Sequence, residues 1–141
     1  MAETLSKEER EAVKERAKEL RAQAKAGRNR EAGEKAVREE IGKLDGDDRE
    51  IADGFYAVVS EGAPHLVPKT YYGMPGFAND EGKIVVFLQP ASKFGSRYST
   101  IGFEDRSTLD EGDMWATHFG VARWSEAVAE QLRELVRRAT S

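Results

Sequence analysis

The sequence predicts an α+β domain, with an antiparallel sheet of about four to six strands flanked by helices and preceded by a helical extension. Up to about residue 62, apolar residues recur at the spacing of helices. From Leu66 onward they alternate with a period of two, as in strands, and a last helical pattern follows residue 125. Helices, then a run of strands, then a helix is the order of an α+β domain with an antiparallel sheet.

The first 27 residues are expected to form one helix. Ser6 and Glu9 have the spacing of a capping box, and Gly27 is a suitable stop. Its apolar stripe is narrow, so the helix either lies loosely on the domain or binds a partner. The residues of this stripe are Val13, Ala17, Leu20 and Ala24.

Two more helices are expected before the strands. The first of them spans residues 29–43 and buries Ala32, Ala36, Val37 and Ile41. After the turn LDGDD, Asp47 or Asp48 caps the other, which ends at Gly62 before the helix-breaking Pro64. Its inward residues are Ile51, Ala52, Phe55, Val58 and Val59. The chain is thus divided into a charged helical extension at 1–45 and an α+β domain at 46–141.

The second half of the chain is expected to hold the sheet. Strands are predicted at 66–74, 83–90, 96–104 and 114–122, with a hairpin turn at Asp80–Gly82. Ser125 then caps a final helix. The inward residues of this helix are Val128, Leu132, Leu135 and Val136.

Composition limits the class of protein. The chain has no cysteine, which excludes disulfides and thiolate chemistry. The charged start MAETLSKEER is not a signal peptide, and no apolar run approaches the ~18 residues of a membrane span. The net charge is −4 and there is no basic run, which argues against nucleic acid as the main partner. We therefore expect a cytoplasmic protein that binds neither membranes nor nucleic acid.

The segment KIVVFLQP is apolar on both faces of its predicted strand. Ile84, Val86 and Leu88 form one face, and Val85 and Phe87 the other. Helices can cover one face, so the other either fills a second small core or stays open as an aromatic surface. The further candidates for this second surface are Tyr71, Tyr72, Tyr98 and Trp115.

The stretch KTYYGMPGFAN is expected to form the rim of this surface. Gly73 and Gly76 flank Met74-Pro75, where the chain bends sharply. Nearby cations either are plain surface charges or bind a carboxylate or phosphate. The candidate ligand-binding residues are Lys69, Tyr71, Tyr72, Met74, Phe87, Lys93, Arg97, Tyr98 and Trp115.

The sequence contains no catalytic motif, so an enzyme is not expected. There is no G-x-S-x-G nucleophile motif and no complete phosphate loop. His65 and His118 lack the short spacing of metal ligands. An acidic segment at 104–113 is either a solvated turn or a weak oxygen site for a hard cation or iron. Its acids are Glu104, Asp105, Asp110, Glu111 and Asp113.

The segments PHLVPKTYYGMPGFAN and KIVVFLQPASKFGSRYSTIGF resemble the YdhG-like family of bacterial domains over roughly residues 47–139. The resemblance rests on the Y-G-M-P turn after P-x-L-x-P-K and on the aromatic strands that follow. It implies a frataxin-like fold and, for some members, an iron chaperone that binds weakly held iron through surface carboxylates on a helix and an edge strand. Besides the 104–113 acids, the nearest carboxylates are those of Asp47, Asp48, Glu50 and Asp53.

Three functions follow as expectations. The first is a small non-enzymatic protein that handles iron, as the resemblance implies. The second is a module that binds a small anion or carboxylate on the aromatic face of the sheet. The third is a protein-interaction domain that uses the first helix, with a partner that the sequence does not identify.

Overall fold

The computed structural model describes residues 6–141, without the side chains at positions 19, 22–24 and 26. The chain divides into two compact units, one ending at Ala32 and the other running from Gly33 to Ser141.

The first helix, α1 (Lys7–Gly42), is longer than expected. Ser6 caps it as predicted, because the backbone N–H of Glu9 donates to the Ser6 Oγ at 3.1 Å. The predicted stop at Gly27 is wrong, and the helix continues through it into the segment that was expected to be a separate helix. An isolated glycine costs only about 1 kcal/mol inside a helix when strong helix formers surround it.

The exposed stripe on α1 is only partly described. Val13 and Leu20 are both exposed, as expected for a helix with few apolar residues. The Ala24 side chain lies outside the described residues. Whether this stripe binds a partner stays a prediction.

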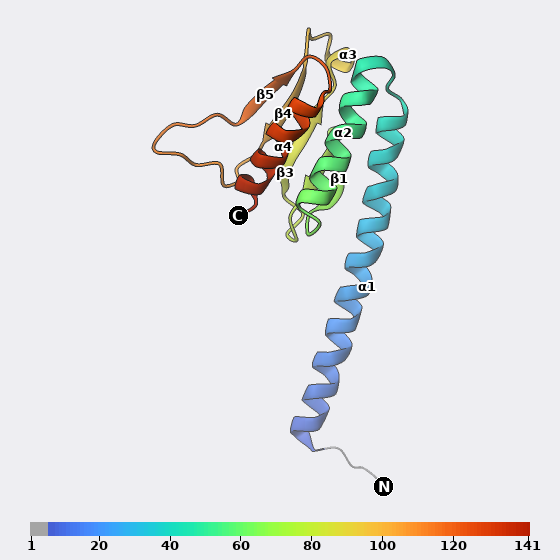
Figure 1. The fold of residues 1–141 in the computed structure, drawn as a ribbon. Helices are drawn as coiled ribbons and strands as arrows, with labels where there is room; N and C mark the ends of the chain where they lie inside the picture. The colour runs from blue at the N-terminus through green and yellow to red at the C-terminus, as the bar shows by residue number, and fades with distance from the viewer. Residues whose placement is uncertain (1–5) are drawn as a thin grey trace. The chain divides into compact units, whose positions relative to one another are not determined.

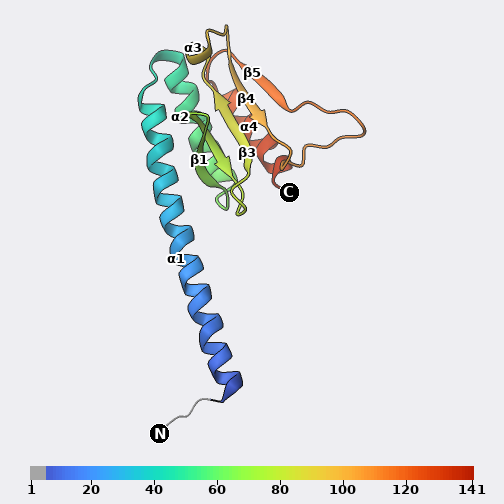
Figure 2. The same ribbon diagram turned by 180° about the vertical axis from the view of Figure 1, so that it is seen from behind.

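The second unit contains the sheet, and its fold class is confirmed (Figures 1 and 2). Five strands pair with their sequence neighbours in the order β1-β2-β3-β4-β5, each pair antiparallel. Helices flank the sheet, which makes this an α+β arrangement. The strands are β1 (Val67–Tyr71), β2 (Met74–Ala78), β3 (Ile84–Gln89), β4 (Ser99–Phe103) and β5 (His118–Val121).

The helices α2 (Gly46–Gly62) and α4 (Glu126–Ala139) pack on one face of the sheet (Figure 1). α2 begins slightly earlier than expected, with Asp45 rather than Asp47 or Asp48 at the N-cap position. Ser125 caps α4 as predicted, accepting from the Val128 N–H at 3.2 Å. A short helix, α3 (Ala91–Phe94), lies between β3 and β4.

The core lies between these helices and the sheet. It also takes in the last part of α1, because Val37 and Ile41 are buried. The predicted inward residues of α2 are all buried. The sheet contributes alternate residues to this core, as the pleat requires. These residues are Phe77, Val86, Leu88, Ile101, Phe103 and Val121. Val85, which was expected on the other face with Phe87, also belongs to the core, next to an irregularity in the β2–β3 register.

The segment expected as one strand at 66–74 is a hairpin. Tyr72 and Gly73 form its two-residue turn, with φ angles of 51° and 77°. Two consecutive positive φ angles are the mark of a type I′ turn, which suits the twist of paired strands. The sharp bend predicted at Met74-Pro75 is therefore wrong, since both residues lie within β2.

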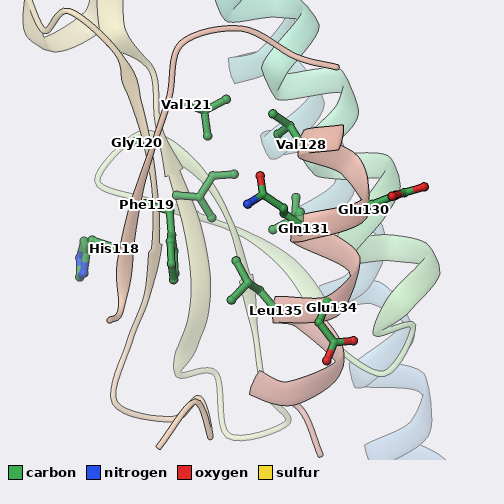
Figure 3. Close-up of a pocket in the computed structure, with 11 residues that line it drawn as sticks. His118, Phe119, Gly120, Val121, Val128, Glu130, Gln131, Glu134 and Leu135 are labelled. Atoms are coloured by element: carbon green, nitrogen blue, oxygen red, sulfur yellow. The ribbon is translucent and has the colours of Figure 1, made fainter. Parts of the chain in front are cut away.

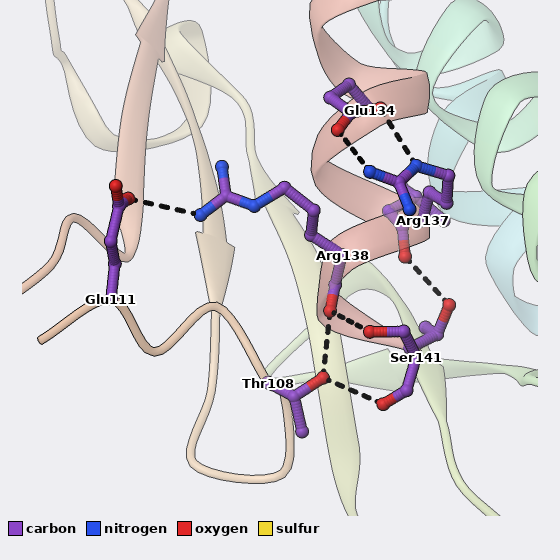
Figure 4. Close-up of polar contacts among 8 residues, drawn as sticks. Thr108, Glu111, Glu134, Arg137, Arg138 and Ser141 are labelled. Atoms are coloured by element: carbon purple, nitrogen blue, oxygen red, sulfur yellow. Dashed lines mark hydrogen bonds and ion pairs between the residues drawn. The ribbon is translucent and has the colours of Figure 1, made fainter.

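The last strand is shorter than expected, because β5 begins at His118 and not at residue 114. Trp115 therefore precedes the strand, in the connection that follows β4. Leu109 anchors this connection in the core, and the Thr108 Oγ1 donates to the Arg138 carbonyl of α4 at 2.8 Å (Figure 4). Glu111 pairs with Arg138 at 3.4 Å.

Candidate functional site

The face of the sheet opposite α2 and α4 carries a row of aromatic rings. The Tyr71 ring centre lies 4.8 Å from that of Tyr72 and 5.2 Å from that of Phe87. Phe87 in turn meets His118 edge to face at 5.9 Å. Gly102 makes room for them, since a methyl group there would lie 2.5 Å from the Phe87 ring.

Three of the predicted ligand-binding residues belong to this row: Tyr71, Tyr72 and Phe87. The fourth ring is that of His118, which the sequence analysis considered only as a metal ligand. Phe87 is only 6% exposed, whereas Tyr72 is 83% exposed. Tyr98 lies over Gly120 and is partly exposed, and Met74 is buried. The result is an open surface of rings rather than an enclosed site.

The cations expected to bind an anion on this face are engaged elsewhere. The Lys69 Nζ donates to the Gly82 carbonyl at 2.9 Å. The Lys93 Nζ donates to the carbonyl of Gly73 at 2.7 Å. Each lysine thus holds a different hairpin turn, and they do not converge on one anion position. Arg97 instead stacks over its neighbour Tyr98, 5.1 Å from the ring centre.

A carboxylate influences the aromatic row. The negative charge of Glu104 raises the pKa of the Tyr71 hydroxyl above its usual value, with smaller contributions from desolvation and from Tyr72. A nearby carboxylate disfavours a second negative charge at this position. The electrostatics of the row therefore suit a neutral or cationic group better than an anion.

The candidate iron ligands do not gather in one place. Asp53 pairs with Arg49 at 3.2 Å, and Asp48 accepts hydrogen bonds from the backbone and hydroxyl of Ser92. Among the side chains that the structure describes, no three His, Asp or Glu residues are placed to hold a metal ion together. Iron handling thus stays a prediction. The other candidate acids on α2 and in the 104–113 segment are exposed: Asp47, Glu50, Asp105, Asp110 and Asp113.

A pocket of about 670 Å³ lies on the other side of β5, between this strand and α4 (Figure 3). Phe119 and Val121 point toward α4, and Val128 and Leu135 point back toward the strand (Figure 3). Ile101 and Leu132 complete its apolar lining. His118 points to the opposite side of the strand, toward the aromatic row (Figure 3).

The polar groups of this pocket are few, and they lie on α4. Gln131 points from α4 toward the strand beside the apolar side chains, and Glu134 lies near the end of the pocket (Figure 3). The Glu130 side chain points away from β5, so only the neighbouring part of this residue borders the pocket (Figure 3). The Arg137 guanidinium hydrogen-bonds Glu134 and lowers the pKa of its carboxyl, so the Glu134 carboxyl keeps its negative charge (Figure 4). The pocket is therefore an apolar cleft with one amide, Gln131, beside its lining and one ion pair, Glu134–Arg137, near its end.

Sequence reasoning identified Val128 and Leu135 as inward residues but did not find the pocket. They are only half-buried, because β5 is the last strand and nothing within residues 6–141 packs beyond it. The available signal was the pair Val128 and Leu135, two apolar residues of the helix beside its fully buried ones, together with the nearby stretch HFGV.

No protein-family model, no curated protein and no solved structure matches this chain. The resemblance to the YdhG-like family therefore stays a prediction. Among the helices of the described chain, none combines the length and the apolar character needed to cross a bilayer.

Proposed function

We propose that the unit from Gly33 to Ser141 is a non-enzymatic binding module and that its ligand occupies the pocket between β5 and α4. The observation that carries this proposal is the pocket itself, with about 670 Å³ of space lined mainly by apolar side chains. Ligand pockets typically enclose about 300–1,000 Å³ and combine an apolar lining with a few polar groups.

The half-buried side chains of the pocket favour an apolar ligand group. Phe119, Val128 and Leu135 pack against the core but remain partly exposed. A ligand that covers them removes apolar area from water, which contributes about 25 cal/mol per Å² buried. Gln131 can donate and accept a hydrogen bond beside them.

The aromatic face is the weaker candidate for a small ligand. Its buried ring, Phe87, is already covered, and its lysines are bound to turn carbonyls. A small anion, which we expected from the sequence, would also meet the charge of Glu104 beside Tyr71. The pocket between β5 and α4 instead offers apolar side chains that remain partly exposed, and a neutral apolar group meets no such charge repulsion there.

A neutral fluorescent probe, N-phenyl-1-naphthylamine, tests the proposal. We expect its emission to rise on binding to the full chain and to saturate at one probe per chain. The variant Leu135→Lys should abolish the rise, because it places a charged group in the apolar lining.

The matched control is Phe94→Lys, which changes an exposed residue of α3 outside the pocket. This variant should bind the probe as the parent chain does. Far-ultraviolet circular dichroism of both variants establishes that each is folded. Unchanged binding by a folded Leu135→Lys variant would disprove the proposed site.

A further inference from the structure

The two edge strands of the sheet, β1 and β5, differ in how well they are protected against pairing with a strand of another chain. At the β1 edge, Pro68 has no N–H, and its carbonyl lies against α1 so closely that a methyl group on Gly33 would come within 1.9 Å of the oxygen. A proline and a covering helix are common ways to prevent another strand from pairing with an edge. Neither is present along β5 in the described part of the chain.

The outer side of β5 presents unpaired backbone groups. The N–H of Phe103 donates to the Thr117 carbonyl at 2.8 Å, which fixes the alternation of the β4–β5 ladder. Since hydrogen-bonded and non-hydrogen-bonded pairs alternate in an antiparallel ladder, Phe119 and Val121 face β4. His118 and Gly120 therefore direct their N–H and C=O groups away from the sheet.

A strand added at this edge would meet a binding surface on each side. Residues opposite one another in a sheet share a face, so a side chain opposite Phe119 would enter the pocket beside Leu135. The side chains before and after it would lie opposite His118 and Gly120, on the aromatic face. Main-chain pairing and an apolar anchor are the two components of peptide recognition by strand addition.

The charges around β5 determine which kind of segment fits. The connection leading into β5 carries five acids and one base at residues 104–113. Among these acids, Glu111 pairs with Arg138, whereas Asp110 and Asp113 are exposed and make no ion pair with any described residue. Two copies of this chain paired through β5 would bring two acidic connections together, whereas a basic partner would neutralise them.

We propose that β5 is the docking edge for an extended basic segment of a partner protein, which pairs with His118 and Gly120 and inserts one aliphatic side chain into the pocket. This inference rests on the proposed function, because it names the class of ligand that fills the pocket. It also explains why the edge strand lacks the protection found at β1.

The probe is the synthetic peptide Lys-Thr-Lys-Leu-Lys-Thr-Lys, added to the full chain while amide hydrogen exchange is followed by NMR. We expect exchange to slow at least tenfold at His118 and Gly120. Phe119 and Val121 should change little, because their N–H groups already bond to β4. A peptide methylated on the nitrogens of the two lysines beside leucine should give no protection.

Two more arms test charge and pocket separately. The peptide Glu-Thr-Glu-Leu-Glu-Thr-Glu should bind at least tenfold more weakly than the basic peptide. Asp113→Asn in the acidic connection should narrow this difference in affinity, whereas Glu61→Gln on α2 should leave it unchanged. Leu135→Asn should weaken binding of the basic peptide, because it makes the pocket lining polar without changing the net charge.

The outcomes separate the two proposals. If the naphthylamine probe binds the pocket but the basic peptide protects neither amide, the proposed function stands and strand addition is disproved. Strand addition is also disproved if the acidic or the methylated peptide binds as tightly as the unmodified basic peptide. If His118 and Gly120 become protected with rising protein concentration and no peptide, the occupant is a second copy of the chain. Failure of both probes would overturn both proposals.

Discussion

Gly54 of α2 lies directly against the indole of Trp124, so that a methyl group on Gly54 would come within 2.1 Å of the ring carbon Cε2. This contact fixes the spacing between α2 and the segment that leads from β5 into α4. The variant Gly54→Ala must therefore displace either the indole or the helix. We expect it to lower the free energy of unfolding by about 1–3 kcal/mol, measured by urea denaturation.

The control for this prediction is the same substitution at another helical glycine. Gly27 lies inside α1 with nothing within 4 Å of an added methyl group. Gly27→Ala should not destabilise the chain, because alanine is the better helix former by about 1 kcal/mol. An equal loss of stability in both variants would show that crowding at Trp124 is not the cause.

The Tyr72–Gly73 turn leads to a second prediction. Tyr72 adopts a left-handed backbone conformation, with φ at 51°, which costs a residue with a side chain roughly 1–2 kcal/mol. Asparagine tolerates this conformation better, so Tyr72→Asn should raise the free energy of unfolding by about 0.5–1 kcal/mol. Tyr72→Phe keeps the ring and should change little. A loss of stability in Tyr72→Asn alone would mean that the ring contact with Tyr71 outweighs the backbone strain.

A third prediction concerns alkaline pH. Because the Tyr71 pKa is raised in the folded state, the folded chain holds this proton at a pH where the unfolded chain releases it. Stability is therefore unaffected below the unfolded pKa of ~10 and falls as the pH rises from there through the folded value. Glu104→Gln removes the largest contribution to the raised Tyr71 pKa. The variant should therefore have a lower Tyr71 pKa and lose less stability at alkaline pH.

This pKa can be followed by the absorbance of tyrosinate during a pH titration, and stability by urea denaturation at each pH. Asp105→Asn is the matched control, since it removes a neighbouring charge that does not contribute to the Tyr71 pKa. If both variants shift the titration equally, a general change in net charge explains the effect.

The division of α1 leads to a fourth prediction. Ile41 is buried in the core, whereas residues before Gly33 belong to a separate compact unit. Ile41→Ala should lower the free energy of unfolding by about 2–5 kcal/mol. Removal of residues 1–27 should change it far less, as thermal and urea unfolding can show. A truncated chain that fails to fold would place the earlier part of α1 in the stable core.

The parts of the fold that could be predicted are those for which a short stretch of sequence gives an unambiguous pattern. The run Ile84–Leu88 is apolar on both faces and could only be an inner strand, which it is. Ser125 had the spacing of a helix cap, and its hydroxyl accepts the expected bond. Local signals of this kind do not depend on the rest of the fold.

The turn and the site depended on contacts that sequence spacing does not show. A tyrosine is a poor residue for a left-handed position, so the Tyr72–Gly73 turn gave little local signal. The aromatic row needs Gly102 beneath Phe87, and these residues meet only when β3 pairs with β4. Likewise, the pocket exists because β5 ends the sheet, a fact of topology rather than of composition.

The order of the strands in the sheet has a consequence for how the chain folds. Each strand pairs with its sequence neighbour, so the sheet can assemble by successive hairpins, of which only β4–β5 must close a longer connection, at residues 104–117. The packing of α4 on α2 instead joins segments more than sixty residues apart. We therefore expect the hairpins to form early and the docking of α4 to limit the folding rate. Because α4 forms one wall of the pocket, an intermediate with its strands paired would present β5 with both its edge and its apolar face uncovered, and would be prone to aggregate.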